Sequence, residues 1–362
     1  MSSRPSAAST GPATDWVAAL NPWPEEFGLD RMRVLLERLG HPERRFRSIH
    51  VVGTNGKSTA TRTIAALLGA EGRRAGAYTS PHVSGWSERI WVDGAEADFE
   101  RAVARIRFEA EAVAATQFEA LTAAALAEFA ERGVDVAVVE AGLGGRLDAT
   151  NVVDAEVVLL TNVSLEHTEV LGDTPGEIAK EKLAVAHAAR VVVLPDNQHA
   201  ELVSNSAEIV TGDERMAAEV FLGRAIEAQP KVSLPGRLER RGRELRDGAH
   251  TAAGAAWLRE QIHEPVEVIV ASILADKDVD GMLAELAPLS DRFVATSSTN
   301  PRALSAPELA ERARVHFAEV KSEADPVWAL ELARRTGDGL VLVTGSLYLL
   351  ADLAAAEEQD VR

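Results

Sequence analysis

One stretch of this chain, RSIHVVGTNGKST at residues 47–59, constrains its fold more than any other. Ile49, Val51 and Val52 form a β-branched run that is typical of a buried strand, and a glycine-containing turn interrupts it. From Lys57 onward, apolar residues recur at the one-face spacing of an amphipathic helix. The stretch therefore predicts a strand, a tight turn and a helix in succession.

The predicted turn has the composition of a phosphate-binding loop. Backbone N–H groups and the positive end of the helix converge there, and Lys57 adds a charge. Ser58 or Thr59 can offer a hydroxyl to Mg²⁺. The general pattern G-x-x-x-x-G-K-[ST] is met only in part, because Val51 occupies the position of its first glycine. A purely structural turn is the alternative, but the lysine and the two hydroxyls favour a nucleoside triphosphate.

The length of 362 residues indicates two domains, because an ordinary domain has roughly 100–200 residues. A hydrophobic fraction of 46% with 26% charged residues is typical of a globular protein. The net charge of −18 would repel a polyphosphate backbone, so we expect no nucleic-acid partner. The chain has no cysteine, which excludes a disulfide framework and thiolate metal sites and is typical of a reducing compartment.

The N-terminal segment MSSRPSAASTGPATD is small and polar, without the apolar centre of a signal peptide. No later run reaches the length of about 18 apolar residues that indicates a membrane span. We therefore expect a cytoplasmic protein with no membrane association, whose residues 1–14 are disordered.

Strand and helix patterns alternate along the rest of the chain. Apolar runs that end at Tyr78, Val139 and Leu160 are each followed by a polar loop, as is the run before Gly53. Because parallel strands present their carboxyl ends at one edge, we expect these loops to share that edge. The alternation predicts an α/β fold: a P-loop-type, mostly parallel sheet with helices on both faces.

We place a domain boundary where helical periodicity weakens and prolines punctuate the chain. Residues 15–228 then form the first domain, 229–236 a linker, and 237–362 a second, smaller Rossmann-like α/β domain. The second domain restarts the alternation, with apolar strand patterns at 266–271 and 340–343.

Several polar residues follow the predicted strands of the first domain. Glu140 ends a run that should be buried, so its carboxylate either caps the glycine turn after it or binds the Mg²⁺ of a nucleotide; spacing does not decide between the two. Ser80 can reach a metal, but Ser-Pro is also an ordinary turn opening. Taken alone, His167 and Lys182 are more typical of a surface histidine and a solvated helix lysine.

In the second domain, Asp247 and His250 lie between a predicted strand and a predicted helix, where Asp247 or Thr251 would cap the helix. The sequence shows no Ser-His-Asp order, no zinc spacing and no G-x-G-x-x-G motif after a strand. A hydrolase triad and a dinucleotide-binding fold are therefore disfavoured.

Taken together, the strings HVVGTNGKST, TSPHVSGWSERI and EAGLGGRLDATN resemble one family. It is the folylpolyglutamate synthases and dihydrofolate synthases, within the Mur-ligase-type ATP-dependent amide ligases. GTNGK is common to all Mur-type ligases, whereas TSPH, GLGGRLDATN and ADKD in this order indicate the folate branch. The strings LEHTEVLG, EIAKEKLAVA, LPGRLE, DGAH, ILADKD and VTGSLYLLADL extend the resemblance from residue 27 to about residue 355.

The resemblance implies ATP and Mg²⁺ as cofactors, and it implies roles for particular residues. Those expected to take part in catalysis are Lys57, Glu140, His167 and Lys182. Those expected to bind ATP are Thr54, Asn55, Gly56, Lys57, Ser58, Thr59, Arg237 and Asp247. The expected metal ligands are Ser80, Glu140 and His167, and Lys182 is expected to support a second Mg²⁺ once it is carbamylated. The residues expected to bind substrate are His82 and His250.

The reaction implied by the resemblance joins two small molecules. A folate or pteroate carboxylate attacks the γ-phosphate of ATP, and Lys57 and Mg²⁺ stabilise the negative charge. The amine of L-glutamate then attacks the resulting acyl phosphate, and closure about residues 229–236 excludes water. We expect a monomer. Two alternatives stay open: the same chemistry on a non-folate carboxylate, and a nucleotide-binding protein that has lost catalysis.

The chain departs from the family pattern at several positions. Ser58 replaces the glycine that usually follows the lysine, Glu166 replaces Asp before the histidine, and Thr251 replaces Asn after DGAH. EKLA stands in place of EKAG. The segment 213–229 is much shorter than in relatives and lacks their H-Q-x-x-N-A-A string, with Met216 in place of the asparagine that contacts adenine.

Overall fold

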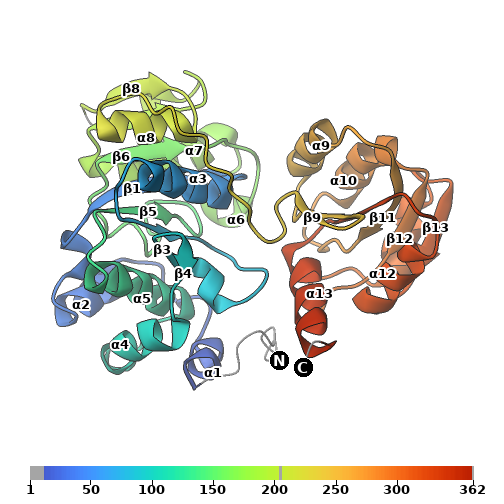
Figure 1. Cartoon of the computed structure of the whole chain (residues 1–362), viewed down its shortest axis with the longest axis horizontal. Coiled ribbons are helices and arrows are strands. Elements are labelled where there is room, and N and C mark those ends of the chain that lie inside the picture. Colours follow the sequence, from blue (N-terminus) through green and yellow to red (C-terminus); the bar gives the residue numbers. More distant parts are fainter. Residues whose placement is uncertain (1–11, 204–205, 361–362) are drawn as a thin grey trace. The chain divides into compact units, whose positions relative to one another are not determined.

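The computed structural model describes residues 12–203 and 206–360, which fold into two compact units (Figure 1). Of the described residues, those up to Val232 form the larger unit, except for the segment His82–Gly85, which belongs to the smaller unit. The smaller unit contains the chain from Ser233 onward. The division between the two units falls between Val232 and Ser233, and the linker at residues 229–236 stays a prediction.

The larger unit is built on an eight-stranded sheet in the order β4-β3-β2-β5-β1-β6-β7-β8. The strands from β2 to β8 in this order are parallel, and β3 and β4 add an antiparallel edge. β1 lies between β5 and β6, and all of its residues after the first are buried. The predicted mostly parallel α/β sheet is thus confirmed. Its strands are β1 Arg47–Val52, β2 Ala75–Tyr78, β3 Ile90–Val92, β4 Ala95–Glu96, β5 Val136–Glu140, β6 Val157–Leu160, β7 Val191–Leu194 and β8 Glu208–Thr211.

Helices cover both faces of this sheet (Figure 1). On one face, Ile64 and Leu68 of α3 share a buried cluster with Ile49 and Val51 of β1, and α8 packs beside α3. On the other face, α2, α4 and α5 contribute to a second, larger cluster. The helices are α1 Pro12–Ala19, α2 Asp30–Arg38, α3 Lys57–Ala70, α4 Phe99–Ala112, α5 Gln117–Glu131, α6 Thr168–Leu171, α7 Pro175–Leu183 and α8 Glu214–Leu222, with the 3-10 turns η1 Pro42–Arg44, η2 Trp86–Arg89, η3 Ala184–Ala188 and η4 Ala200–Leu202.

The smaller unit has a six-stranded sheet in the order β13-β12-β11-β14-β10-β9, parallel except for β9. Helices α9, α10 and α11 contribute to a buried cluster on one face, and α12 and α13 to a cluster on the other. Its elements are β9 Glu239–Arg241, β10 Glu244–Arg246, α9 Ala252–Gln261, β11 Val266–Ala271, α10 Val279–Leu286, η5 Ala287–Leu289, β12 Arg292–Ala295, α11 Ala306–Ala313, β13 Glu319–Ser322, α12 Pro326–Arg334, β14 Leu340–Thr344 and α13 Leu347–Asp360.

The N-terminal segment differs in part from the expectation. Residues 1–11 lie outside the described residues, but α1 begins at Pro12, so the expected disorder does not extend to residues 12–14. Ala13 and Thr14 are buried, and their backbone N–H groups donate to the Glu100 carboxylate at 2.9 and 3.3 Å. This carboxylate supplies acceptors for N–H groups that the first turn of a helix leaves unpaired.

The short strands β3, β4, β9 and β13 were not anticipated from the sequence. β4, β9 and β13 lie at sheet edges and carry few apolar residues, whereas β3 is an apolar run of only three residues. Across the described residues, no helix is both long and apolar enough to span a membrane.

Candidate functional site

The turn between β1 and α3 lies at the carboxyl end of one of the two central strands of the sheet. Gly53 and Gly56 have φ values of +146° and +80°, which side chains with a Cβ rarely adopt. A Cβ on Gly53 would lie only 2.0 Å from Oγ1 of Thr161, at the end of β6. The predicted strand, glycine turn and helix are confirmed, and the turn is in close contact with the neighbouring strand end.

Hydrogen bonds from the segment after β6 fix the shape of this turn. The backbone N–H of Thr54 donates to the carbonyl of Asn162 at 3.0 Å. The Asn55 N–H donates to Oδ1 of Asn162, and the Asn55 carbonyl accepts from Nδ2 of Asn162, each at 3.0 Å. The Thr161 hydroxyl also donates to the Asn55 carbonyl at 2.7 Å. The backbone of the turn is thus held from outside, which preorganises it for a ligand.

Glu140 joins the turn to two other strand ends. It is the last residue of β5, lies opposite Val51 in the register and is buried. Its Oε1 accepts from the Ser58 hydroxyl at 3.1 Å, and its Oε2 accepts from the backbone N–H of Ser80 at 3.0 Å. Three residues that the sequence offered as candidates are therefore brought together at one point.

Lys182 is also part of this group, although a solvated helix lysine was the simpler expectation. Its ammonium is buried and donates to the Gly53 carbonyl at 2.8 Å and to Oε1 of Glu166 at 2.9 Å. The Lys57 ammonium donates to the carbonyl of Thr54 at 3.0 Å. Two lysines from different helices therefore lie at one glycine turn.

The charges of this group shift one another's pKa values. Burial lowers the pKa of Lys182, repulsion from Lys57 lowers it further, and Glu166 opposes both effects only in part. Burial would raise the pKa of Glu166, but attraction to Lys57 and Lys182 outweighs it, so the pKa of Glu166 is lowered. The Glu166 carboxylate thus stays ionised between two lysines.

His167 precedes the single turn of α6, in the loop where it was expected. Its backbone is left-handed, with φ of 46°, and its Nδ1 lies 3.7 Å from Oε1 of Glu169. Its charge also lowers the pKa of Glu166, after the larger effects of Lys57 and Lys182. His167 is therefore electrostatically coupled to the group at the glycine turn.

The donor chemistry at Glu140 suits a hard divalent cation. A carboxylate and the hydroxyl of Ser58 lie side by side at the start of α3, and Mg²⁺ prefers such oxygen ligands. No group of three or more His, Cys, Asp or Glu side chains that could hold a metal occurs in the part of the chain that the structure describes. The expected set of Ser80, Glu140 and His167 contains only two such side chains, so it does not conflict with that finding.

The candidates in the smaller unit cluster around a tight turn. Asp247 is buried, and its carboxylate accepts from the backbone N–H groups of Leu238 and Ala249, each at 2.9 Å. Burial raises the pKa of Asp247, while these N–H groups and the charge of Arg237 oppose that shift. The Arg237 guanidinium donates to the carbonyl of Gly236 at 3.1 Å. Asp247 thus fixes the backbone that carries Arg237.

His250 and His82 lie in different surroundings. Nδ1 of His250 lies 2.9 Å from the Gly248 carbonyl. The cap of α9 is Thr251, whose hydroxyl accepts from the Gly254 N–H at 3.0 Å, so the capping alternative for Asp247 is excluded. His82 belongs to the segment that clusters with the smaller unit.

Reasoning from the sequence missed two buried residues beneath the loop after Glu140. Asp148 accepts from the N–H groups of Leu143 and Thr150 at 2.7 and 3.0 Å, and from the Thr150 hydroxyl. Nε2 of His50, on β1, lies 2.9 Å from that same hydroxyl. A histidine inside the apolar run 49–52 was the available signal, because a buried polar side chain needs a partner.

The shortened segment after β8 forms a compact helix. Asp213 caps α8 by accepting from the N–H groups of Arg215 and Met216 at 3.0 and 3.2 Å. The side chain of Met216 packs against Gly212 and the buried cluster beneath α3. Met216 therefore has a packing role in this chain.

Comparison with known families and proteins identifies the family to which this chain belongs. The Mur ligase middle domain matches residues 51–231, and the Mur ligase, glutamate ligase domain matches residues 236–347. The chain therefore belongs to the Mur ligases, and the two matches follow the two units of the fold.

Particular relatives narrow the family. The chain is 32% identical to the dihydrofolate synthase/folylpolyglutamate synthase of Mycobacterium tuberculosis, over 94% of each chain. It is 27% identical to the protein of the same name from Escherichia coli, over 96% of this chain and 95% of that one. Within the Mur ligases, the chain belongs to the dihydrofolate synthase/folylpolyglutamate synthases.

Solved structures agree with this assignment. The Escherichia coli FolC structure in complex with DHPP and ADP matches with a TM-score of 0.85 and 26% identity, over 99% of this chain and all of that one. The Yersinia pestis enzyme with Mn, AMPPNP and L-glutamate bound matches with a TM-score of 0.84 and 28% identity, over 98% of this chain and 100% of that chain.

Proposed function

We propose that this protein is an ATP- and Mg²⁺-dependent ligase that joins L-glutamate to the carboxylate of a pteroate or folate through an acyl phosphate. The observation that carries the proposal is the grouping of Lys57, Lys182, Ser58 and Glu140 around one preorganised glycine turn. The relatives bear the names of this activity, and related structures hold ADP, AMPPNP, Mn and L-glutamate.

The chain's own residues account for the phosphoryl-transfer step. The N–H groups at the start of α3 and residues Thr54–Thr59 hold the phosphates, and Lys57 places positive charge where the transferred phosphoryl gains negative charge. Ser80, Glu140 and His167 would hold the divalent cation, and a cation there would supply further positive charge for phosphoryl transfer. Lys182, modified to a carbamate, is the expected support for a second cation.

In our proposal the smaller unit supplies residues both for the nucleotide and for the incoming amino acid. We propose that Arg237 and Asp247 contact the nucleotide and that His250 faces the incoming amino acid, with His82 contacting substrate. The carboxylate of Asp247 accepts two backbone N–H groups, so its contribution is to fix the turn that carries Arg237. We also propose that the protein is a cytoplasmic monomer.

An acceptor panel tests the proposed reaction. Dihydropteroate, tetrahydrofolate and unrelated carboxylates are each supplied with ATP, Mg²⁺ and L-glutamate, and release of ADP is measured together with the amide product. We expect turnover with at least one pteroate or folate acceptor. Turnover only with other carboxylates would favour the non-folate alternative, and nucleotide binding without any turnover would favour a protein that has lost catalysis.

The role of Glu140 has a separate test. Glu140→Gln keeps the shape of the side chain but removes its charge, so the Mg²⁺ concentration needed for half-maximal activity should rise by about tenfold or more. Glu181→Gln, on the same edge of the fold and outside the proposed ligand set, is the matched control. Equal Mg²⁺ dependence in the two variants would remove Glu140 from the ligand set.

A further inference from the structure

The turn at residues 234–238, which leads into the smaller unit, is held at several backbone positions. The Arg237 N–H donates to the carbonyl of Leu234 at 3.2 Å. The carbonyl of Gly236 accepts from the Gly248 N–H at 2.9 Å and from the Arg237 guanidinium at 3.1 Å. The backbone of this turn therefore sets the direction of the Arg237 side chain.

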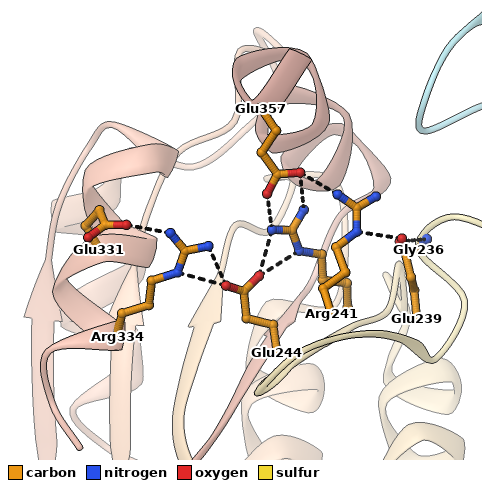
Figure 2. A network of polar contacts seen from close by, with 8 residues as sticks. Gly236, Glu239, Arg241, Glu244, Glu331, Arg334 and Glu357 are labelled. Atoms are coloured by element: carbon orange, nitrogen blue, oxygen red, sulfur yellow. Dashed lines mark hydrogen bonds and ion pairs between the residues drawn. The ribbon is translucent and has the colours of Figure 1, made fainter. Parts of the chain in front are cut away.

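A chain of charged side chains begins at the same turn and reaches the last helix (Figure 2). The Gly236 N–H donates to Oε2 of Glu239 at 2.9 Å, and Oε1 of Glu239 accepts from Nε of Arg241 at 2.6 Å. The other end of the Arg241 guanidinium donates to Glu357, near the end of α13. Arg241 thus connects Glu239, whose carboxylate holds the turn, with the distant helix α13.

The far end of this chain is anchored in the interior of the unit. Arg246 is buried on β10 and donates to both Glu357 and Glu244, with 2.7 Å from its Nη2 to Oε2 of Glu244. Glu244 also accepts from Nε of Arg334 at 2.8 Å, and Arg334 pairs in addition with Glu331. Every guanidinium in the network contacts two carboxylates, so the group is mutually satisfied.

Apolar packing ties the turn to the same helix. Gly236 has φ of +64°, and a Cβ there would lie 2.7 Å from Cδ1 of Leu350 on α13 and 3.1 Å from Cγ2 of Val83. The backbone thus approaches α13 closely at the residue whose N–H the network holds. The Leu350 contact ties this turn to α13, and Val83 belongs to the same buried cluster as Leu350.

We propose that Glu239, Arg241 and Glu357 are positioning residues that hold the 234–238 turn, and through it Arg237, in the conformation that binds nucleotide phosphate. The inference rests on the proposed function for its effect on nucleotide, but its effect on the turn is independent of that function. Loss of the Arg241 link frees Glu239 to turn toward solvent and leaves the Gly236 N–H without a fixed acceptor.

The chain offers a matched control on the same strand. Arg240 precedes Arg241 on β9, and its guanidinium pairs with Glu264, where both side chains are about half exposed. Exposed pairs of this kind contribute little to stability. Arg240→Met therefore removes an arginine and an ion pair from β9 without touching the network.

Hydrogen exchange tests the effect on the turn. The backbone N–H groups of Leu234, Gly236, Arg237 and Leu238 are followed in the unliganded full-length protein for Glu239→Gln, Arg241→Met and Arg240→Met. We expect exchange in this segment to accelerate by about tenfold in the first two variants, with no change in Arg240→Met and none in strands β11 and β14. Equal exchange in all three variants would overturn the proposal, as would acceleration throughout the unit.

Nucleotide affinity tests the effect on Arg237. The KM for ATP, and the Kd for ADP with Mg²⁺ by calorimetry, should rise by about fivefold or more in Glu239→Gln and Arg241→Met, with kcat at saturating ATP within about twofold of wild type. Arg241→Lys should restore affinity only in part, because an ammonium cannot bridge two carboxylates as a guanidinium does. The double variant should be no worse than Arg241→Met, since both residues act through one link.

Hydrogen exchange and nucleotide affinity together distinguish a failure of this inference from a failure of the proposed ligase function. Faster exchange with unchanged nucleotide affinity would show that the turn does not position Arg237, which overturns the inference and leaves the proposed ligase function intact. A wild-type protein that binds no nucleotide would overturn the proposed function, and the exchange result would still decide whether the network holds the turn.

Discussion

The two charged groups of this molecule are balanced differently. In the larger unit, Lys57 and Lys182 face the carboxylate of Glu166 at a glycine turn, and no described carboxylate lies within ion-pair distance of Lys57. In the smaller unit, three arginines share four glutamates in a network with no surplus positive charge (Figure 2). The Lys57 ammonium of the first group contacts only a backbone carbonyl and is available for an anion, whereas the charged side chains of the second group pair with one another and with the backbone.

The difference predicts that substitutions in the two groups have separable effects. A change in the first group should alter chemistry more than stability, and a change in the second should alter stability more than chemistry. Substitutions in each of the two groups, and at His50 beneath the first group, test this distinction.

The largest expected effect is that of Lys57→Ala. Turnover should fall by about a hundredfold to a thousandfold or more, because charge stabilisation at the transferred phosphoryl is lost. The free energy of unfolding should stay within about 0.5 kcal/mol of wild type, because no ion pair is broken. Steady-state ADP release and urea unfolding measure the two quantities, and Lys180→Ala on α7 is the control. Activity close to wild type would place the phosphate site elsewhere.

Arg246→Ala should show the opposite pattern. It leaves Glu244 and Glu357 without their buried partner, so the free energy of unfolding should fall by roughly 3–5 kcal/mol. The kcat of the folded fraction at saturating ATP should change far less than in Lys57→Ala. Urea unfolding measures this change. Arg240→Ala is the control, and its free energy of unfolding should fall by no more than about 1 kcal/mol. A small stability loss would show that the network is solvated in solution.

His50 supplies a third test. It lies on β1, beneath the first group, and its buried side chain is neutral in the folded protein. Burial lowers its pKa from 6.5 to about 3, and the charge of His187 adds to the shift. The unfolded chain therefore binds a proton that the folded protein does not, so stability is fully present above pH 6.5 and falls as the pH drops toward 3. Between pH 7 and pH 5 the loss should be about 2 kcal/mol.

His50→Gln should remove that part of the pH dependence. Urea unfolding of wild type and variant at pH 7 and pH 5 measures it as a difference of differences, which cancels the contributions of the other histidines. Identical pH dependence in the two proteins would show that His50 is solvated in the folded state or paired with an anion.

The smallest expected effect is that of Ser58→Gly, which restores the residue that the family usually has. The hydrogen bond to Glu140 is lost, so the free energy of unfolding should fall by about 1 kcal/mol. Turnover should stay within about threefold of wild type, because Ser58 lies outside the proposed ligand set of Ser80, Glu140 and His167 and the lysines remain. Ser58→Ala separates the lost hydrogen bond from the greater freedom of glycine. A loss of turnover as large as that of Lys57→Ala would make the hydroxyl a metal ligand.

The local part of the site could be predicted from the sequence. The strand, turn and helix over residues 47–70 follow from a change of apolar period at a pair of glycines, which is information carried by neighbouring residues. The position of Glu140 at a strand end followed in the same way. Its partner Ser58 could not be found, because that contact joins residues 82 positions apart.

Burial of charge was the part that the sequence did not reveal. Lys182 lies on a helix with charged neighbours, and which face of α7 is buried depends on packing that no local pattern encodes. The network of Arg241, Arg246 and Glu357 has the same origin, since alternating charges on β9 and β10 look like a solvated surface until α13 is placed. The family resemblance pointed to Lys182, whereas no sequence signal pointed to the network.

The close approach of Gly53 to Thr161 has a consequence for protein engineering. Because Asn162 and Thr161 hold the backbone of Asn55, the glycine turn and the segment after β6 form one interlocked part made from two distant pieces of chain. A chimera that imports the turn of another ligase without its matching counterpart should lose the conformation of this turn. Exchange of both pieces together is the smallest transplant that we expect to succeed.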